Sequence, residues 1–258
     1  MGKTTPNRRE PLTIEMVSAA AAHARTSTAT HLEKALADWF ILGILIGPRL
    51  SEWAQDSSTF PKNGFKRNVD GSVSAFIASD FQFRGNTNKR LGSIFNITFD
   101  EVASVIITWR YQKNGDNGQT VTVTKNLSQP DFCPVAAIWR IQQRAASCKV
   151  ASTHPVAVYP DDQGKAQYIT SSHIATALKT IAQNIYNITD KKDLGRFTSH
   201  SLRVGACVAL HMSRASIMDI KHRLRWRSDS FQTYLCDIFQ LGTRHNEFIN
   251  HLIDHFQH

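Results

Sequence analysis

Two segments place cationic side chains where they can bind an anion. In HSLRVGA, His200 and Arg203 stand three residues apart, so on a helix both project from the same face. That spacing can present two hydrogen-bond donors to one anion. Far upstream, GPRLSEW places Arg49 just past the end of an apolar segment, with Glu52 one helical turn later.

A third segment, RLRWRSDSFQTYL, combines cations with aromatic side chains. We predict that Arg225 and Trp226 lie in a loop and that Asp229 caps a helix over residues 230–238. Tyr234 then falls in the second turn of this helix. The sequence therefore predicts a loop and a helix that bring an indole and a phenol to the same region.

The helix that must position Arg49 is the best marked in the chain. Thr30 and Glu33 form a capping box. The residues that follow, up to Leu45, are apolar on most sides of a helix, which is typical of a buried one. The helix is expected to end at Gly47-Pro48, immediately before Arg49.

A β-hairpin is predicted in the middle of the chain. Residues 105–111 alternate in the manner of a strand, 114–118 (NGDNG) supply turn chemistry, and 120–124 return as a β-branched strand. Lys113 lies at the tip of this hairpin. Weaker strand patterns precede it at Phe76-Ile77 and Phe81-Gln82-Phe83.

The remaining periodic segments predict helices, so the fold class is α+β and mainly α, a helical domain with a small antiparallel β-sheet in its first half. Residues 1–10 are polar and basic and read as a tail or linker. Pro11-Leu12-Thr13 offers a cap for a helix that extends to about Ala24. Further helices are expected over residues 135–146, 172–188, 201–212 and 215–224.

Composition favours an intracellular protein that acts on a polyanion. Thirty Lys and Arg against 21 Asp and Glu give a formal charge of +9 and a pI near 9.6. Four widely spaced cysteines suggest neither a disulfide framework nor a zinc site. The most apolar stretch, Trp39 to Gly47, is about half the length that spans a bilayer, so no membrane partner is expected.

Together these segments resemble the catalytic domain of the tyrosine recombinase (phage integrase) family, which has the fold of DNA breaking-rejoining enzymes. That family carries an Arg in a G-x-R-x-S-E context, a Lys on a β-hairpin, an H-x-x-R pair, a His or Trp, and a Tyr. The resemblance spans about residues 11–240. The matching residues occur in the same order, namely Arg49, Lys113, His200, Arg203, Trp226 and Tyr234.

The resemblance implies a role for each of these residues on double-stranded DNA. Arg49 and Arg203 would clamp the scissile phosphate, and Tyr234 would attack it to form a 3′-phosphotyrosyl bond. No metal ion or nucleotide cofactor is then required.

The other matching residues would handle protons and hydrogen bonds. Lys113 would protonate the leaving 5′ oxygen. His200 would bind the phosphate or accept the tyrosine proton, and Trp226 would donate its indole N–H to a phosphate oxygen. Glu52 would orient a neighbouring catalytic side chain.

The loop after residue 224 departs from the family pattern. Counted back from Tyr234, the His or Trp position falls on Arg225, with Trp226 one place later. The RWRSD context, which also occurs in integrase-like proteins of mobile elements, favours Trp226, but the Arg225 guanidinium can do the same work. Leu224 stands where the family usually has Gly. Lys125, near the other end of the hairpin, is the alternative to Lys113.

The leading interpretation is a site-specific recombinase or integrase of a mobile element. A type IB topoisomerase shares the chemistry, and a degenerate or domesticated relative that only binds DNA is the alternative from a different class. Intact Arg49, His200, Arg203 and Tyr234 argue against that second alternative. Localisation is expected to be intracellular, nuclear in a eukaryote and otherwise cytoplasmic.

The last segment, residues 241–258, is expected to form a C-terminal helix. The family resemblance implies that such a helix docks on a neighbouring subunit, giving a homo-oligomer, a tetramer on DNA, although packing in cis is an equally simple interpretation. His251, His255 and His258 fall at helical spacing and are read as its polar face rather than as metal ligands. Its apolar stripe consists of Phe248, Ile249, Leu252, Ile253 and Phe256.

Overall fold

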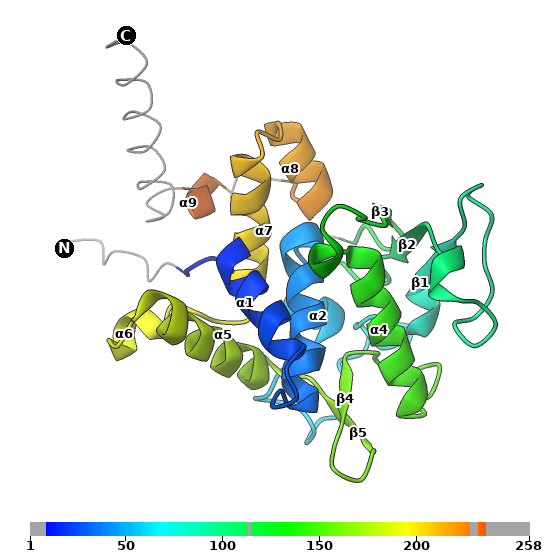
Figure 1. The fold of residues 1–258 in the computed structure, drawn as a ribbon, viewed down its shortest axis with the longest axis horizontal. Coiled ribbons are helices and arrows are strands. Elements are labelled where there is room, and N and C mark those ends of the chain that lie inside the picture. Colours follow the sequence, from blue (N-terminus) through cyan, green and yellow to red (C-terminus); the bar gives the residue numbers. More distant parts are fainter. Residues whose placement is uncertain (1–8, 113–114, 228–231, 236–258) are drawn as a thin grey trace.

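The computed structural model describes residues 9–112, 115–227 and 232–235. Helix α2 (His31–Ile46) runs through the middle of the molecule, between α1 (Ile14–Ala24) and α4 (Pro134–Ser147), as Figure 1 shows. Most of its residues are buried, including Asp38, which is 2% exposed. The prediction of a mainly helical domain with a small antiparallel sheet is confirmed.

The two predicted N-terminal helix caps are present. Thr30 accepts a hydrogen bond from the Glu33 amide, and the Glu33 carboxylate accepts one in return from the Thr30 amide at 2.8 Å. Thr13 caps α1 by accepting from the amide of Met16. These caps fix where both helices begin, because each satisfies amides that have no partner within the helix.

A buried carboxylate joins α2 to α4 through two ion pairs. Asp38 accepts hydrogen bonds from Arg140 at 2.7 Å and from Arg144 at 2.6 Å. The carboxylate is thereby satisfied inside the protein, as a buried charge must be. The central helix is held in a fixed orientation relative to α4.

A three-stranded antiparallel sheet with strand order β1-β2-β3 lies to one side of α4 (Figure 1). Its strands are β1 (Phe81–Arg84), β2 (Ser104–Thr108) and β3 (Thr120–Thr124), with Val105 opposite both Phe83 and Val123. These three side chains are buried. The predicted hairpin is confirmed, although β2 ends at Thr108 rather than at Tyr111.

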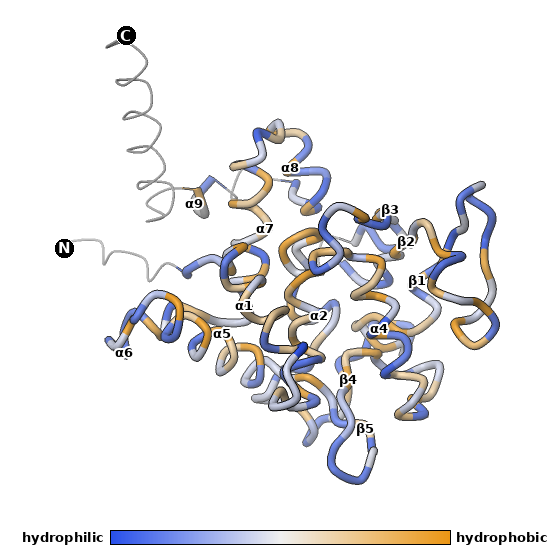
Figure 2. The backbone as a smooth tube through the Cα atoms, viewed as in Figure 1, coloured by the Kyte–Doolittle hydropathy of each residue, from blue (hydrophilic) through white to orange (hydrophobic). Residues whose placement is uncertain are grey.

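After the sheet, α5 (Ser171–Tyr186), α7 (Ser201–Met212) and α8 (Ile217–Leu224) match predicted helices to within two residues at each end. Helix α6 (Lys191–Leu194) was not predicted, and only α9 (Gln232–Leu235) of the helix expected over residues 230–238 lies within the described residues. Polar and apolar residues alternate along α5 in Figure 2, in keeping with its one buried face. Helix α8 begins two residues later than expected, because Ser216 caps it.

Some predictions of secondary structure were wrong or incomplete. Phe76-Ile77 forms no strand, because Phe76 is pinned by backbone hydrogen bonds to Glu52 and Val156 and packs among aromatic rings. The hairpin of β4 (Val158–Pro160) and β5 (Ala166–Tyr168) was not foreseen, nor were α3 (Leu50–Trp53) and α6.

The predicted tail is only partly within the described residues. Of residues 1–10, the structure describes Arg9 and Glu10, which contact the end of α6 through hydrogen bonds to the carbonyls of Gly195 and Arg196. Among the described helices, none combines the length and apolar character needed to cross a membrane.

Close packing sets α7 against α2. A β-carbon at Gly43 would lie 2.7 Å from Leu202 Cδ2, so only glycine allows α7 this close. Helix α2 then ends at Gly47, whose φ of 52° is left-handed and favours glycine. These two positions bring the start of α7 near the chain that follows α2.

Candidate active site

Four of the predicted site residues line one pocket of about 740 Å³. Arg49 comes from the chain after α2, His200 and Arg203 from the start of α7, and Trp226 from the chain after α8. The remaining wall is largely the segment 54–66. Three segments that are far apart in the sequence therefore meet around a single space.

Arg49 is held by the helix that it starts. It occupies the N-cap position of α3, where Glu52 accepts a hydrogen bond from the Arg49 amide at 2.7 Å and one from Arg49 Nη1 at 2.9 Å. The Glu52 side chain is 1% exposed, whereas that of Arg49 is 23% exposed. Glu52 thus fixes the guanidinium while leaving part of it open to the pocket.

The same carboxylate also binds Arg225. Arg225 Nη2 donates to Glu52 Oε2 at 3.0 Å, and the guanidinium carbon lies 3.3 Å from the centre of the Trp109 ring. Burial lowers the pKa of Arg225 to about 10, partly offset by the charge of Glu52. Arg225 is therefore an interior cation behind Arg49, and it does not line the pocket.

The backbone at the end of α8 separates Arg225 from Trp226. Arg225 is the C-cap residue of α8, with a left-handed φ of 56°. Its side chain enters the interior, and the next residue, Trp226, faces the pocket. Of the two alternatives left open by the sequence, the structure places Trp226 in the pocket.

Arg203 is a buried cation that is 2% exposed. Its Nη1 donates to the carbonyl of Gly47 at 2.7 Å, and its Nη2 donates to the carbonyl of Leu224. Both carbonyls stand at helix C-termini, where backbone oxygens lack helical partners. The ring of Trp226 lies 4.6 Å from the guanidinium carbon. Arg203 is consequently fixed where α2 and α8 end.

His200 precedes α7 as its N-cap residue and lines the pocket while half-buried. Burial lowers its pKa below the ordinary value, and the charges of Arg203, Arg9 and Arg49 lower it further. The imidazole is therefore neutral at pH 7, with one nitrogen able to accept a proton or a hydrogen bond.

Lys113, together with Asn114, lies outside the described residues, but the residues on both sides of it contact the pocket region. Tyr111 lies under the ammonium group of Lys66, a pocket residue. Asp116 forms an ion pair with Arg227, which directly follows Trp226. The residues on both sides of Lys113 therefore contact residues that line the pocket or directly follow one that does.

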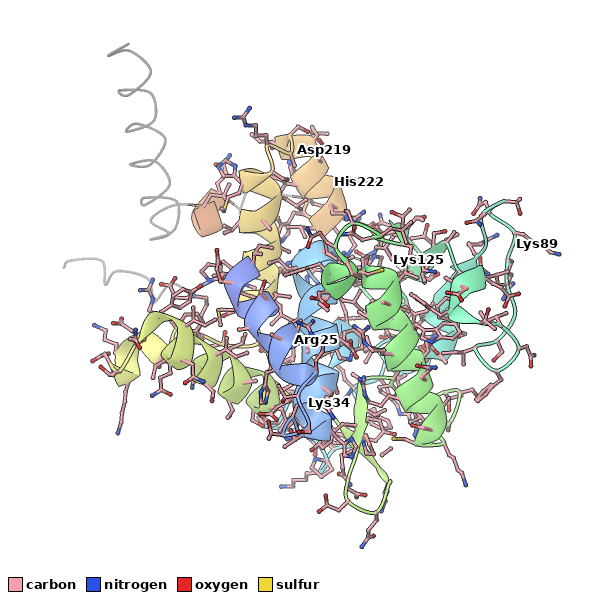
Figure 3. All side chains as sticks on the ribbon, in the orientation of Figure 1. Arg25, Lys34, Lys89, Lys125, Asp219 and His222 are labelled. Carbon is pink, nitrogen blue, oxygen red and sulfur yellow. The ribbon has the colours of Figure 1, made fainter. Side chains whose placement is uncertain are left out.

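The alternative lysine, Lys125, is engaged elsewhere. Its Nζ donates to the carbonyl of Phe99 at 2.9 Å and lies 4.0 Å from the centre of the Phe99 ring. Figure 3 places Lys125 beside the start of α4. It does not line the pocket.

Tyr234 belongs to α9, but its side chain lies outside the described part of the structure. Leu235 packs against Val204 and Val208 of α7, the helix that also carries Arg203. The helix that bears Tyr234 is thus packed on the helix that bears the H-x-x-R pair. Asp229 and the C-terminal residues 241–258, including the three histidines and the apolar stripe, fall outside the described ranges.

Sequence reasoning missed Lys66, a pocket-lining residue at the end of the loop that begins at Asp56. No periodicity or motif marks it in the sequence.

Taken together, the pocket offers two guanidiniums, an ammonium, a neutral imidazole and an indole to a ligand. Such a set binds an oxyanion such as a phosphodiester. Within the described ranges, no cluster of three or more His, Cys, Asp or Glu side chains is arranged to hold a metal ion.

Comparisons with protein-family models and with curated proteins found no match. Among solved structures, the chain resembles the XerH site-specific recombinase bound to its difH substrate in a pre-cleavage complex, with 14% identity and a TM-score of 0.48. It also resembles the Tn1549 transposon integrase in complex with transposon right-end DNA, with 12% identity and a TM-score of 0.48. Each match covers 90% of this chain, but only 50% of the XerH chain and 62% of the integrase chain.

Proposed function

We propose that this protein is a tyrosine recombinase of a mobile element, which cleaves and rejoins double-stranded DNA through a covalent bond to Tyr234. The observation that carries the proposal is the convergence of Arg49, His200, Arg203 and Trp226 on one pocket. The net charge of +9 suits a polyanionic substrate.

In this proposal the pocket binds the scissile phosphate. Arg49 and Arg203 neutralise its non-bridging oxygens, and both guanidiniums are already held by Glu52 or by helix-terminal carbonyls, so little reorganisation is needed. The indole N–H of Trp226 donates a further hydrogen bond. Arg225 acts as a positioning residue, because it holds Glu52 and through it Arg49.

The chemical step is a transesterification. The phenol oxygen of Tyr234 attacks phosphorus, the bond to the 5′ oxygen breaks, and the tyrosine proton passes to His200. Lys113 gives a proton to the leaving 5′ oxygen. Because the phosphotyrosyl bond conserves the energy of the phosphodiester, a 5′ hydroxyl can reverse the step without a nucleotide cofactor.

Assembly and location are also parts of the proposal. Recombination requires several subunits on DNA, and the apolar stripe of residues 248–256 is the segment assigned to subunit contact. Replacing Phe248, Leu252 and Phe256 by Ser should then abolish multimers on DNA and leave a folded protein. The protein would act inside the cell, in the nucleus of a eukaryote.

The decisive experiment tests Tyr234. A pool of nicked duplexes, in which the short 5′-hydroxyl fragment diffuses away after cleavage, is incubated with the protein in EDTA. We expect a covalent adduct joined to a 3′-phosphate that is absent from Tyr234→Phe and retained in Tyr186→Phe, a tyrosine that does not line the pocket. An adduct in Tyr234→Phe would refute the nucleophile. DNA binding with no adduct from the wild type would favour the binding-only alternative.

Relaxation of supercoiled plasmid by a monomer, without sequence preference, would favour the type IB topoisomerase alternative. The two enzymes share the phosphotyrosyl step, so only the requirement for a defined site and several subunits separates them.

A further inference from the structure

Lys66 is a pocket residue with no role in the proposed reaction so far. Its ammonium nitrogen lies 5.1 Å from the centre of the Tyr111 ring, within the range of a cation–π contact. In the described part of the chain, this ammonium donates no hydrogen bond and forms no ion pair. The pKa of Asp56, another pocket residue, is lowered mainly by hydrogen bonds that its carboxylate accepts from Ser58, with a smaller contribution from the charge of Lys66. The donors of the Lys66 ammonium are therefore available to a ligand in the pocket.

The segment that carries Lys66 is anchored at its first end. The Gln55 amide donates to the carbonyl of Ile169 at 2.9 Å, and the Ser171 amide donates back to Gln55 at 2.8 Å. The Ser57 amide donates to Ser171 Oγ at 3.0 Å. These bonds attach the start of the segment to the chain leading into α5.

The other end of the segment is fixed as well. The Phe65 ring packs edge-on against Tyr168 at 4.7 Å between ring centres, and the carbonyl of Lys66 accepts a hydrogen bond from the Ser74 amide at 2.9 Å. A lysine on a fixed backbone with an aromatic platform loses less conformational entropy when it binds a ligand than one on a free loop.

The pocket is larger than one phosphate requires. Its volume of about 740 Å³ falls within the range that encloses ligands of drug size. Lys66 lies over the Tyr111 ring, whereas Arg49 is held by Glu52 and Arg203 by the Gly47 carbonyl. The cations of the pocket are therefore held by separate partners, and a pocket of this volume has room for a second phosphate beside the first.

We propose that Lys66 binds a second backbone phosphate of the DNA strand, beside the phosphate held by Arg49, His200 and Arg203, and that the Tyr111 ring orients it. This inference rests on the proposed function, because it takes DNA as the ligand. Through Tyr111 the contact also joins the segment 54–66 to the hairpin that carries Lys113 at its tip.

The test compares two lysines in the same segment. Lys66→Gln and the control Lys62→Gln each remove one charge from an exposed residue, but Lys62 does not line the pocket. Binding of a mixed-sequence duplex is measured as a function of salt. Loss of one phosphate contact should reduce the slope of log K against log salt by about 0.9 in Lys66→Gln, whereas Lys62→Gln should keep the wild-type slope.

Tyr111 is tested with two variants. Tyr111→Phe keeps the ring and should bind DNA as the wild type does. Tyr111→Leu removes the ring and should weaken DNA binding, as Lys66→Gln does. Wild-type affinity in Tyr111→Leu would overturn the role of the ring.

Equal slopes in the two lysine variants would overturn the contact at Lys66. If the wild type still forms the Tyr234 adduct in that case, only the role of Lys66 is lost. If the wild type binds no DNA, the proposed function itself fails, and this inference fails with it.

Discussion

Arg225 and Glu52 form a buried ion pair with 3.0 Å between Nη2 and Oε2, and their side chains are 4% and 1% exposed. Because Glu52 also binds the amide and the guanidinium of Arg49, the pair links an interior cation to a pocket cation. The arrangement at Arg49 therefore depends on a carboxylate that itself faces away from solvent.

Replacing Glu52 by Gln should destabilise the fold strongly. Removing one partner of a buried pair leaves the Arg225 charge uncompensated and costs about 3–5 kcal/mol. Urea denaturation would measure the free energy of unfolding. Glu33→Gln is the matched control, since Glu33 has the same position in the capping box of α2 but is about half exposed. It should lose no more than about 1 kcal/mol. Equal losses in the two variants would contradict the importance of the buried pair.

Trp226 should contribute to catalysis through its N–H group. Trp226→Phe keeps an aromatic ring over the Arg203 guanidinium but removes the donor. Losing a hydrogen bond of about 1–1.5 kcal/mol in the transition state should slow single-turnover cleavage roughly tenfold. Trp139→Phe, in α4 and outside the pocket, should cleave at the wild-type rate. A Trp226→Phe enzyme as fast as the wild type would exclude the indole N–H from the step.

Short-range sequence patterns predicted the helices and strands well, but they predicted the residues of the pocket less completely. The caps at Thr13 and Thr30 could be predicted because their hydrogen bonds connect residues only three apart. The sequence could not predict that Arg225 enters the interior while Trp226 faces the pocket. This difference follows from the left-handed backbone of Arg225 at the end of α8 and from the position of its guanidinium over the Trp109 ring. Lys66 was missed for a similar reason, because its place in the pocket depends on contacts with residues more than a hundred positions away.

The strands of β4 and β5 show a second limit. Each has only three residues, too few for an alternating pattern to stand out. Their pairing depends instead on the Asp161 turn, where the carboxylate accepts hydrogen bonds from the amides of Gln163 and Lys165. The resemblance to a recombinase motif, by contrast, selected four residues that meet in one pocket although they are spread from position 49 to position 226.

The lowered pKa of His200 gives a prediction for the pH dependence of cleavage. Burial and the charges of Arg203 and Arg49 favour the neutral imidazole, so the proton acceptor of the proposed reaction is present in the free protein at pH 7 and is lost only as the pH falls below the ordinary value of 6.5. At DNA concentrations far below saturation, where the groups of the free protein set the profile, the cleavage rate should therefore fall at acid pH with a midpoint below 6.5. A nuclear magnetic resonance titration of His200 in the DNA-free protein should give the same midpoint.

The control for this profile is a histidine outside the pocket. His222→Gln changes an exposed residue of α8, labelled in Figure 3, and should keep the acid limb of the wild-type profile. His200→Gln should be slower at pH 7 and lose this limb. An acid limb that persists in His200→Gln would assign it to another group.

Lys113 should act on the leaving group. The residues that flank it contact the pocket wall through Tyr111 and the segment after Trp226 through Asp116, whereas Lys125 is bound to Phe99. Lys113→Ala should slow cleavage of ordinary DNA about a hundredfold or more. A substrate with a 5′-bridging sulfur, whose thiolate leaves without a proton, should restore the rate. Lys125→Ala should leave both rates near those of the wild type. If Lys113→Ala were equally slow on both substrates, the proton would come from another residue, and rescue in Lys66→Ala by the sulfur substrate would identify Lys66 as its source.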